Sequence, residues 1–287
     1  MHLPRPSSPR QRIRPDAPGY LVVGYLLAII YALLIIVPLY FVFVSSFKNT
    51  QEIYHGLLKL PDHFDLTNYV AALREGELLH AMGVSGFVTV SAIVVTLVLA
   101  FPAAYAIARI PSRLAVWTEN FFGLGFLIPA LAMLVPIFLT IVNLGLLNNP
   151  LALVIVYPAT ALPLTVFMLA SVLRAVPRDL EESAEIDGAT RLQMMIRIFV
   201  PLASSGIATV TILNFIGFWS EYLFAMVLLN QQSRTVQIAV TLLKSQRAPN
   251  FGLVSAGVVI SMIPIYAIFI LFQERIVMGR LAGAVKQ

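Results

Sequence analysis

The sequence predicts an all-α polytopic membrane protein with six transmembrane helices. Composition is the first reason: 59% of the 287 residues are apolar and 11% are charged, whereas about 25% of a soluble domain is charged. The second reason is a series of six apolar stretches, each long enough to supply the roughly 20 helical residues that span a bilayer. The third is that basic residues gather in alternate connections between these stretches.

The first predicted span covers residues 21–47 and follows a basic tail, residues 1–20, that contains four arginines. This start resembles a secretory signal, but the apolar run is too long and no small-residue cleavage site follows it, so we expect an uncleaved helix. The six-helix domain is expected over residues 21–274, and residues 275–287 form a second terminal tail. The remaining spans are expected at 82–108, 120–141, 151–172, 202–229 and 253–272.

The distribution of basic residues predicts that both termini are cytoplasmic. Of the 19 lysines and arginines, 13 lie in the two tails and in the connections at 109–119 and 173–201. Cytoplasmic connections carry the excess of basic residues in membrane proteins, so topology explains the net charge of +5 without a nucleic-acid ligand. The chain has no cysteine, and its four histidines lie outside the spans without ligand spacing, so we expect no metal site.

Several prolines lie inside the predicted spans, where each removes a backbone hydrogen bond and favours a kink. Kinked helices suit a gated path, although kinks also arise from ordinary packing irregularity. The connection at 48–80 is the longest one on the outer side and is expected to carry short helices. The prolines concerned are at positions 38, 102, 129, 136, 158, 163 and 264.

The loop at 177–201 is the most informative part of the sequence and reads PRDLEESAEIDGATRLQMMIRIFVP. Four acids lie within its first two helical turns, which predicts a short helix with an anionic surface for a basic partner. Gly188 then allows a sharp turn, and Asp187 is a candidate cap for a second helix.

The second predicted helix of this loop carries an apolar stripe. Leu192, Met195 and Phe199 recur at i, i+3 and i+7, so we expect them to face the membrane surface together. The loop is then a helix, a turn and a helix that project from the cytoplasmic face. It is either a docking element for another protein or a solvated connection whose charges keep it out of lipid.

The same loop resembles the coupling motif of binding-protein-dependent ABC import permeases. That motif reads Glu, Ala, Ala, three residues, Gly, nine residues, Ile, one residue, Leu, Pro. The chain has Glu182, Ser183, Ala184, Gly188, Ile198, Val200 and Pro201 at this spacing, with conservative changes to Ser and Val. Five further segments of the chain resemble the carbohydrate-uptake, maltose-permease-like branch of this family. They are Glu185 to Thr190, Ser46-Phe47-Lys48, Asn68-Tyr69, Trp219-Ser220-Glu221-Tyr222, and Gly283-Ala284-Val285-Lys286. At Ser220, relatives often have Asn.

The resemblance implies a role for each part of the loop. Its first helix would be a coupling helix seated in a groove of a cytoplasmic ATPase, where Glu182 would pair with a basic residue, Ala184 would pack closely and Gly188 would make the turn. The terminal tail would reach between the ATPases through Gly283 and Lys286, or would fray in solvent. The residues expected to couple to the ATPase are Glu182, Ser183, Ala184, Asp187 and Gly188.

The resemblance also implies the partners. They are a second permease that is a different chain, two cytoplasmic ATPases that bind ATP and magnesium, an external solute-binding protein and a sugar-like substrate, in the bacterial cytoplasmic membrane. The sequence contains no GxxxxGKS or GxxxxGKT phosphate loop, so the chain itself is expected to bind no cofactor and to have no catalytic residue.

One acid, Glu221, lies deep in a predicted span, where an ionisable group costs at least about 2.5 kcal/mol unless it finds water or a partner. Asn214, Gly217, Phe218 and Glu221 share one partly polar helix face that is expected to look inward. Glu221 is thus either a translocation-path residue or a buried acid that ties two helices together. Trp219 and Tyr222 are candidates for stacking on a sugar, or else packing and interfacial anchors.

The expected function is ATP-driven import of a carbohydrate or polyol. An alternative is a permease of the same class for glycerol phosphates. A secondary transporter driven by ions would favour paired intramembrane acids and inverted repeats, which the sequence lacks, and a membrane scaffold would leave the loop insensitive to changes at Glu182.

Overall fold

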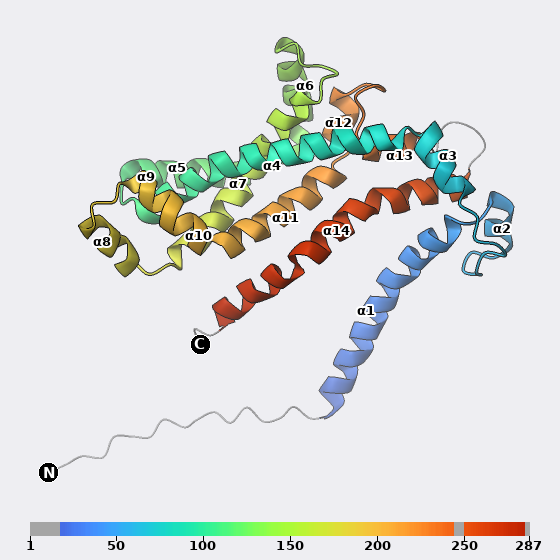
Figure 1. Cartoon of the computed structure of the whole chain (residues 1–287), viewed down its shortest axis with the longest axis horizontal. Helices are drawn as coiled ribbons and strands as arrows, with labels where there is room; N and C mark the ends of the chain where they lie inside the picture. Colours follow the sequence, from blue (N-terminus) through green and yellow to red (C-terminus); the bar gives the residue numbers. More distant parts are fainter. Residues whose placement is uncertain (1–17, 244–249, 285–287) are drawn as a thin grey trace.

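The computed structural model describes residues 18–243 and 250–284, and within these ranges the chain is helical without strands. Four helices are long and apolar enough to cross a membrane. They are α1 (Pro18–Ser45), α4 (Leu78–Arg109), α7 (Leu151–Arg174) and α14 (Phe251–Ala284), as Figure 1 shows. Helix α14 continues past residue 272, where the last span was expected to end.

Two further spans are bent, and together with the four straight ones they make up to six, as predicted. The third predicted span consists of α5 (Arg113–Gly125), the 3₁₀ turn η1 (Ala130–Met133) and α6 (Leu134–Asn143), with a bend of 92°. The break lies inside the predicted span, where prolines were expected to favour a kink. Pro129 lies at the break with extended backbone, and proline both disfavours helical geometry in the residue before it and lacks an N–H.

The fifth predicted span is also broken. Helix α11 (Ser204–Ser220) begins with a bend of 76° from the preceding short helices, and α12 (Leu223–Leu228) follows it. Within the predicted span over 202–229, the helix is interrupted at Glu221, whose backbone leaves the helical region with φ −68° and ψ 133°.

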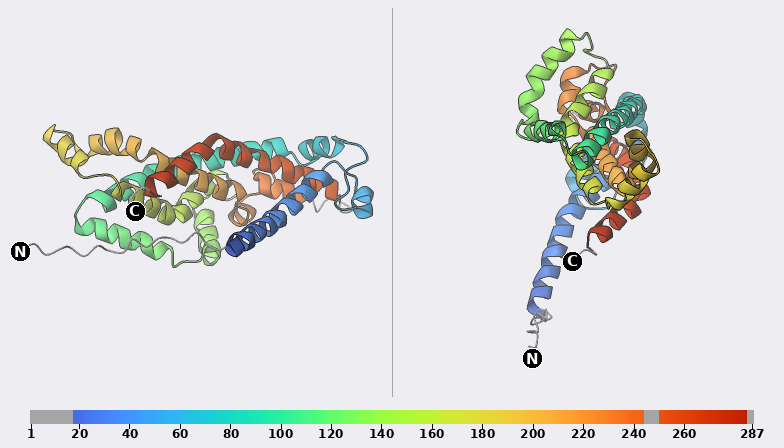
Figure 2. Two further views of the ribbon diagram at one scale, coloured as in Figure 1. Left: turned by 90° about the horizontal axis from the view of Figure 1, so that it is seen from below. Right: turned by 90° about the vertical axis from the view of Figure 1, so that its left-hand side faces the viewer.

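Short helices occupy the two opposite ends of the bundle. Helices α2 (Thr50–His55), α3 (Thr67–Glu75) and α13 (Val236–Leu243) lie at one end, which confirms the short helices expected in residues 48–80. Helices α8 (Asp179–Ile186) and α9 (Arg191–Met194) lie at the other end, followed by the π-helix η2 (Met195–Phe199) and α10 (Val200–Leu202). Figures 1 and 2 show this separation from different directions.

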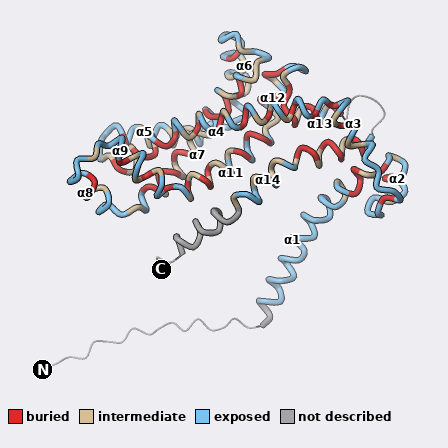
Figure 3. Tube along the Cα trace, in the orientation of Figure 1, coloured by how far each residue is buried: buried red, intermediate tan, exposed pale blue. Residues whose placement is uncertain are grey.

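The core lies among α4, α7, α11 and α14. Helix α4 packs mainly against α7, and α11 packs against α4, α7 and α14. At the α7–α11 contact, a Cβ on Gly206 would lie 2.7 Å from a methyl carbon of Val172, so the close approach requires glycine. Helix α1 diverges from this core and is exposed along most of its length, as Figure 3 shows. A helix that is apolar on all sides suits a lipid environment or contact with another subunit.

Residues far apart in the sequence meet where α1 ends. The Asn68 side chain donates to the carbonyls of Ser46 and Lys48 at 3.0 and 2.9 Å, and the hydroxyls of Ser46 and Tyr69 lie 2.7 Å apart. A Cβ on Gly252 would collide with the Lys48 carbonyl and with the Asn68 amide. The sequence features at 46–48 and 68–69 therefore form one junction that joins α1, α3 and the start of α14.

Candidate functional site

Helix α8 presents an acidic surface at one end of the molecule. Asp179, Glu181 and Glu182 lie in its first turn, where carboxylates are favoured by the positive end of the helix dipole. Glu182 and Ser183 are exposed, whereas Ala184 on the opposite side is buried in the core of this chain. The helix is thus fixed along one side and open to a partner along the other.

Gly188 makes the turn that ends α8, as expected. Its φ of +78° lies in the left-handed region that favours glycine. The Gly188 N–H donates to the carbonyl of Glu185 and the Ala189 N–H donates to that of Ala184, each at 3.0 Å. This pair of bonds is the Schellman motif, and it sets the direction in which the chain leaves α8.

The second helix of the loop differs from the prediction in two respects. Asp187 is exposed and does not cap this helix, because the Thr190 hydroxyl accepts from the Gln193 N–H and the Gln193 side chain accepts from the Thr190 N–H. The expected stripe also does not form one outward face: Leu192 is 61% exposed, whereas Phe199 is fully buried. The π-helix accounts for this, since its wider i→i+5 turn changes the register of the side chains.

Arg109, which we treated only as a topological charge, contacts this loop from the end of α4. Its guanidinium lies 3.7 Å from a Glu181 carboxylate oxygen, and its side chain is buried. The one signal in the sequence was its position at the end of a long apolar stretch. That position does not identify Glu181, 72 residues later in the chain, as the partner of Arg109.

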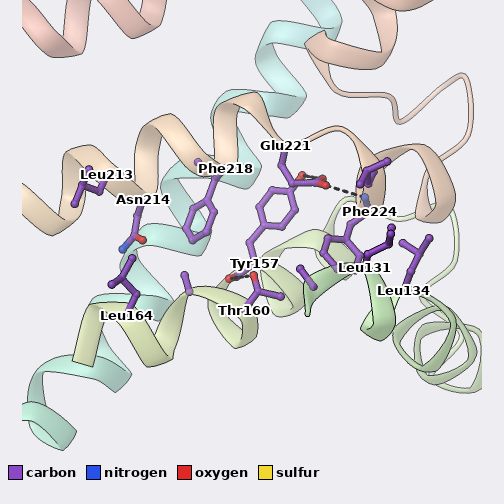
Figure 4. Close-up of a pocket in the computed structure, with 14 residues that line it drawn as sticks. Leu131, Leu134, Tyr157, Thr160, Leu164, Leu213, Asn214, Phe218, Glu221 and Phe224 are labelled. Atoms are coloured by element: carbon purple, nitrogen blue, oxygen red, sulfur yellow. Dashed lines mark hydrogen bonds between the residues drawn. The ribbon is translucent and has the colours of Figure 1, made fainter. Parts of the chain in front are cut away.

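The second candidate site is an open cavity of about 370 Å³ between η1, α6, α7, α11 and α12 (Figure 4). Its walls are mainly apolar, with a few polar groups, which is the usual character of a small-molecule site. It is lined by Ala130, Leu131, Leu134, Tyr157, Thr160, Ala161, Leu164, Leu213, Asn214, Gly217, Phe218, Glu221, Leu223 and Phe224.

Glu221 is held by three hydrogen bonds at the wall of this cavity. Its carboxylate accepts from the Tyr157 hydroxyl at 2.9 Å and from the N–H groups of Phe224 and Ala225 at 2.8 and 3.1 Å. The two N–H groups belong to the first turn of α12, so the acid caps that helix from within the bundle. Both interpretations of Glu221 thus have structural support, because the residue lines a cavity and also ties three helices together.

The four residues of the partly polar face predicted in the fifth span all line the cavity. Asn214 also pairs with Thr165 on α7, its amide donating to the hydroxyl at 3.1 Å. Phe218 stacks on Tyr157, with ring centroids 5.2 Å apart. Tyr157 was not predicted, since a tyrosine within an apolar stretch carries no signal of its orientation.

Two other predicted residues do not line this cavity. Trp219 is buried, its indole N–H donates to the Ser261 carbonyl on α14 at 3.0 Å, and its ring stacks on Phe215. Tyr222 precedes α12 and is half-buried. In the C-terminal segment, Gly283 falls within α14, and Lys286 lies outside the described residues.

Comparison with known proteins gives consistent results. Residues 97–279 match the family described as "Binding-protein-dependent transport system inner membrane component". The chain is 34% identical to the diacetylchitobiose uptake system permease protein NgcG of Streptomyces coelicolor, over 93% of this chain and 88% of that protein. It is 31% identical to the sulfoquinovosyl glycerol transport system permease protein SmoH of Agrobacterium fabrum, over 87% and 88%.

Among solved structures, the chain resembles a bacterial ABC transporter involved in the import of the acidic polysaccharide alginate. The TM-score is 0.77 at 23% sequence identity, over 94% of this chain and 99% of that one. At this identity the likeness supports the fold.

Proposed function

Since the chain belongs to the family of binding-protein-dependent transport system inner membrane components, we propose that it is the permease subunit of an ATP-driven carbohydrate importer. The observation that carries this proposal is the α8 loop. It presents exposed carboxylates on a helix that is anchored to the core through Ala184 and ended by Gly188. Such a helix suits a basic groove on another protein, because charged hydrogen bonds form with the exposed side while the buried side transmits the force.

The protein that carries this groove is a cytoplasmic ATPase, which binds ATP and magnesium and supplies the energy for import. Two ATPases, a second permease of different sequence and an external solute-binding protein complete the proposed assembly. In this arrangement both termini and α8 face the cytoplasm, and α2, α3 and α13 face the binding protein. The separation of these helices at opposite ends of the bundle supports this orientation.

A carbohydrate substrate is favoured by the relatives, one a diacetylchitobiose permease and another a sulfoquinovosyl glycerol permease. Both names denote glycosides, and the second includes a glycerol group. The cavity combines apolar walls with the polar groups of Thr160 and Asn214. An apolar wall with a few polar groups suits the mixed apolar and hydroxylated surface of a sugar. We propose that Asn214 and Glu221 line the translocation path.

The test is uptake into proteoliposomes that contain the purified complex with its binding protein. Radiolabelled diacetylchitobiose is the probe, and unlabelled sulfoquinovosyl glycerol and glycerol phosphate are competitors. We compare the wild type with Glu182→Lys, which reverses the charge on the exposed side of α8. The matched control is Arg113→Glu, also a charge reversal, at an exposed residue at the start of α5 and outside the α8 loop.

We expect ATP-dependent uptake in the wild type and in Arg113→Glu, and loss of the bound ATPase or of ATP-dependent uptake in Glu182→Lys. If glycerol phosphate reduces the uptake of the labelled probe and sulfoquinovosyl glycerol does not, glycerol phosphates become the favoured substrate class. Uptake that proceeds without ATP and is unchanged in Glu182→Lys would contradict the importer assignment and favour an ion-coupled transporter.

A further inference from the structure

Arg109 occupies an unusual position at the end of α4. It is the last residue of that helix, yet it is only 7% exposed. Arginine is rarely buried unless it is paired, because removing its charge from water costs several kcal/mol. The contacts that compensate this cost therefore show which parts of the structure Arg109 holds.

The first contacts are with the end of α7. The guanidinium donates through Nη2 to the carbonyls of Leu173 and Val176, the latter at 2.5 Å. These carbonyls lie at the negative end of the α7 dipole, which favours a cation. Arg109 thus joins the ends of the two helices that form the centre of the core.

The remaining contacts reach both halves of the loop that carries α8. Nη1 lies 3.7 Å from the carboxylate of Glu181 in the first turn of α8. The guanidinium carbon lies 4.9 Å from the ring centroid of Phe199, at the end of the π-helix, within the range of a cation–π interaction. The Phe199 ring in turn packs edge-on against Tyr105, one helical turn before Arg109 on α4.

One side chain therefore holds the end of α7, the start of α8 and the end of the π-helix against α4. Most of the loop between residues 181 and 199 is exposed, so Glu181 and Phe199 are two of its few fixed points. The Arg109 Nε atom is buried and has no partner within the described residues. The guanidinium group of Arg109 thus retains one N–H donor, at Nε, beyond the contacts described above.

We infer that Arg109 is a positioning residue that makes α8 move as one body with α4 and α7. This inference rests on the proposed function, in which an ATPase displaces α8. A lysine could keep the charge opposite Glu181, but its single ammonium group lacks the planar fork that reaches two carbonyls and stacks on Phe199. Lysine is therefore expected to replace arginine only in part.

The test measures the distance between α8 and the end of α4 in the assembled complex. The natural chain has no cysteine, so within this subunit spin labels attach only at introduced sites. Suitable sites are Ile186→Cys on α8 and Leu114→Cys at the start of α5, which are 87% and 75% exposed. Arg109→Gln, Arg109→Lys and Glu181→Gln are compared with Arg197→Gln, the same change at an exposed arginine in the same loop.

In the wild type and in Arg197→Gln, we expect a narrow distribution of distances that is unchanged when the complex is trapped with ATP and vanadate. In Arg109→Gln, the distribution should be about twice as wide without nucleotide and should shift on trapping, with Arg109→Lys between the two. A role limited to stability would lower the yield of complex but leave these distances unchanged. If Arg109→Gln does not assemble, Arg109→Lys and Glu181→Gln decide the question by the same measurement.

A wild-type distribution in the assembled arginine and glutamate variants would overturn the inference. Failure of the proposed function has a different signature. In that case uptake proceeds without ATP and is unchanged in Glu182→Lys, and vanadate trapping does not bind an ATPase to the wild type. The distribution without nucleotide still tests Arg109, because it does not depend on the ATPase.

Discussion

Replacing Glu221 with alanine should destabilise the junction between α7, α11 and α12. The substitution leaves three donors without their acceptor: the Tyr157 hydroxyl and the N–H groups of Phe224 and Ala225. Within a membrane these groups have few other partners, because lipid offers no hydrogen bonds. The loss should therefore appear as a lower free energy of unfolding as well as reduced transport.

The magnitude follows from the number of hydrogen bonds. Interhelical hydrogen bonds in membrane proteins contribute about 0.6 kcal/mol on average and up to about 1.7 kcal/mol. The Tyr157 bond is of this kind, and the two bonds that cap α12 add about 0.5–2 kcal/mol. Glu221→Ala should therefore lose about 1–4 kcal/mol. Tyr157→Phe removes one bond and keeps the ring that stacks on Phe218, so it should cost about 0.6–1.7 kcal/mol. Glu221→Gln keeps one acceptor oxygen and should fall between these two variants.

The assay is unfolding of the purified protein in mixed micelles by titration with a denaturing detergent, combined with uptake of diacetylchitobiose in proteoliposomes. We expect the order of stability to be wild type, Tyr157→Phe, Glu221→Gln and Glu221→Ala. The reasoning is refuted if Glu221→Ala unfolds at the wild-type detergent concentration while the KM for uptake rises. That result would make Glu221 a substrate contact rather than an anchor.

Three further predictions test other parts of the structure. Gly188→Ala should cost about 1–2 kcal/mol, because its φ of +78° is unfavourable for a residue with a Cβ, and should reduce ATPase binding in a pull-down; wild-type binding would argue against a fixed turn. Gly206→Ala should cost about 1–3 kcal/mol in the same unfolding assay, because its methyl group would collide with the stiff Val172 side chain, whereas an unchanged midpoint would show that α7 and α11 can separate freely. Trp219→Phe loses the bond to Ser261 but should leave the KM for uptake unchanged, since Trp219 does not line the cavity; a raised KM would return it to the substrate path.

Much of the fold could be predicted from the sequence. The apolar stretches gave the positions of the spans, because length and hydropathy alone decide whether a segment fits the bilayer. The turn at Gly188 was predicted from residue type, since a left-handed residue is most often glycine. Helical spacing placed Asn214, Gly217, Phe218 and Glu221 on one face, and all four line the cavity.

Other features could not be predicted, because they depend on contacts between distant segments. The helix break at Glu221 depends on α12 and on Tyr157, which lies 64 residues earlier. The prediction that Leu192, Met195 and Phe199 share one face assumed a regular α-helix. The π-helix changes the register of these side chains. Thr190 caps the second loop helix in place of Asp187. After the turn at Gly188, the Thr190 hydroxyl lies where it can accept from the Gln193 N–H.

Composition, hydropathy and short motifs are properties of local segments, so they were enough to predict an all-α membrane protein with a structured acidic loop. The tertiary structure alone decided that Arg109 holds that loop, that Glu221 caps α12, and that Trp219 packs against α14. The physical reason is that a periodic pattern specifies which side chains share a face, but not which other helix that face meets. That choice is made by packing and by the need of every buried polar group for a partner.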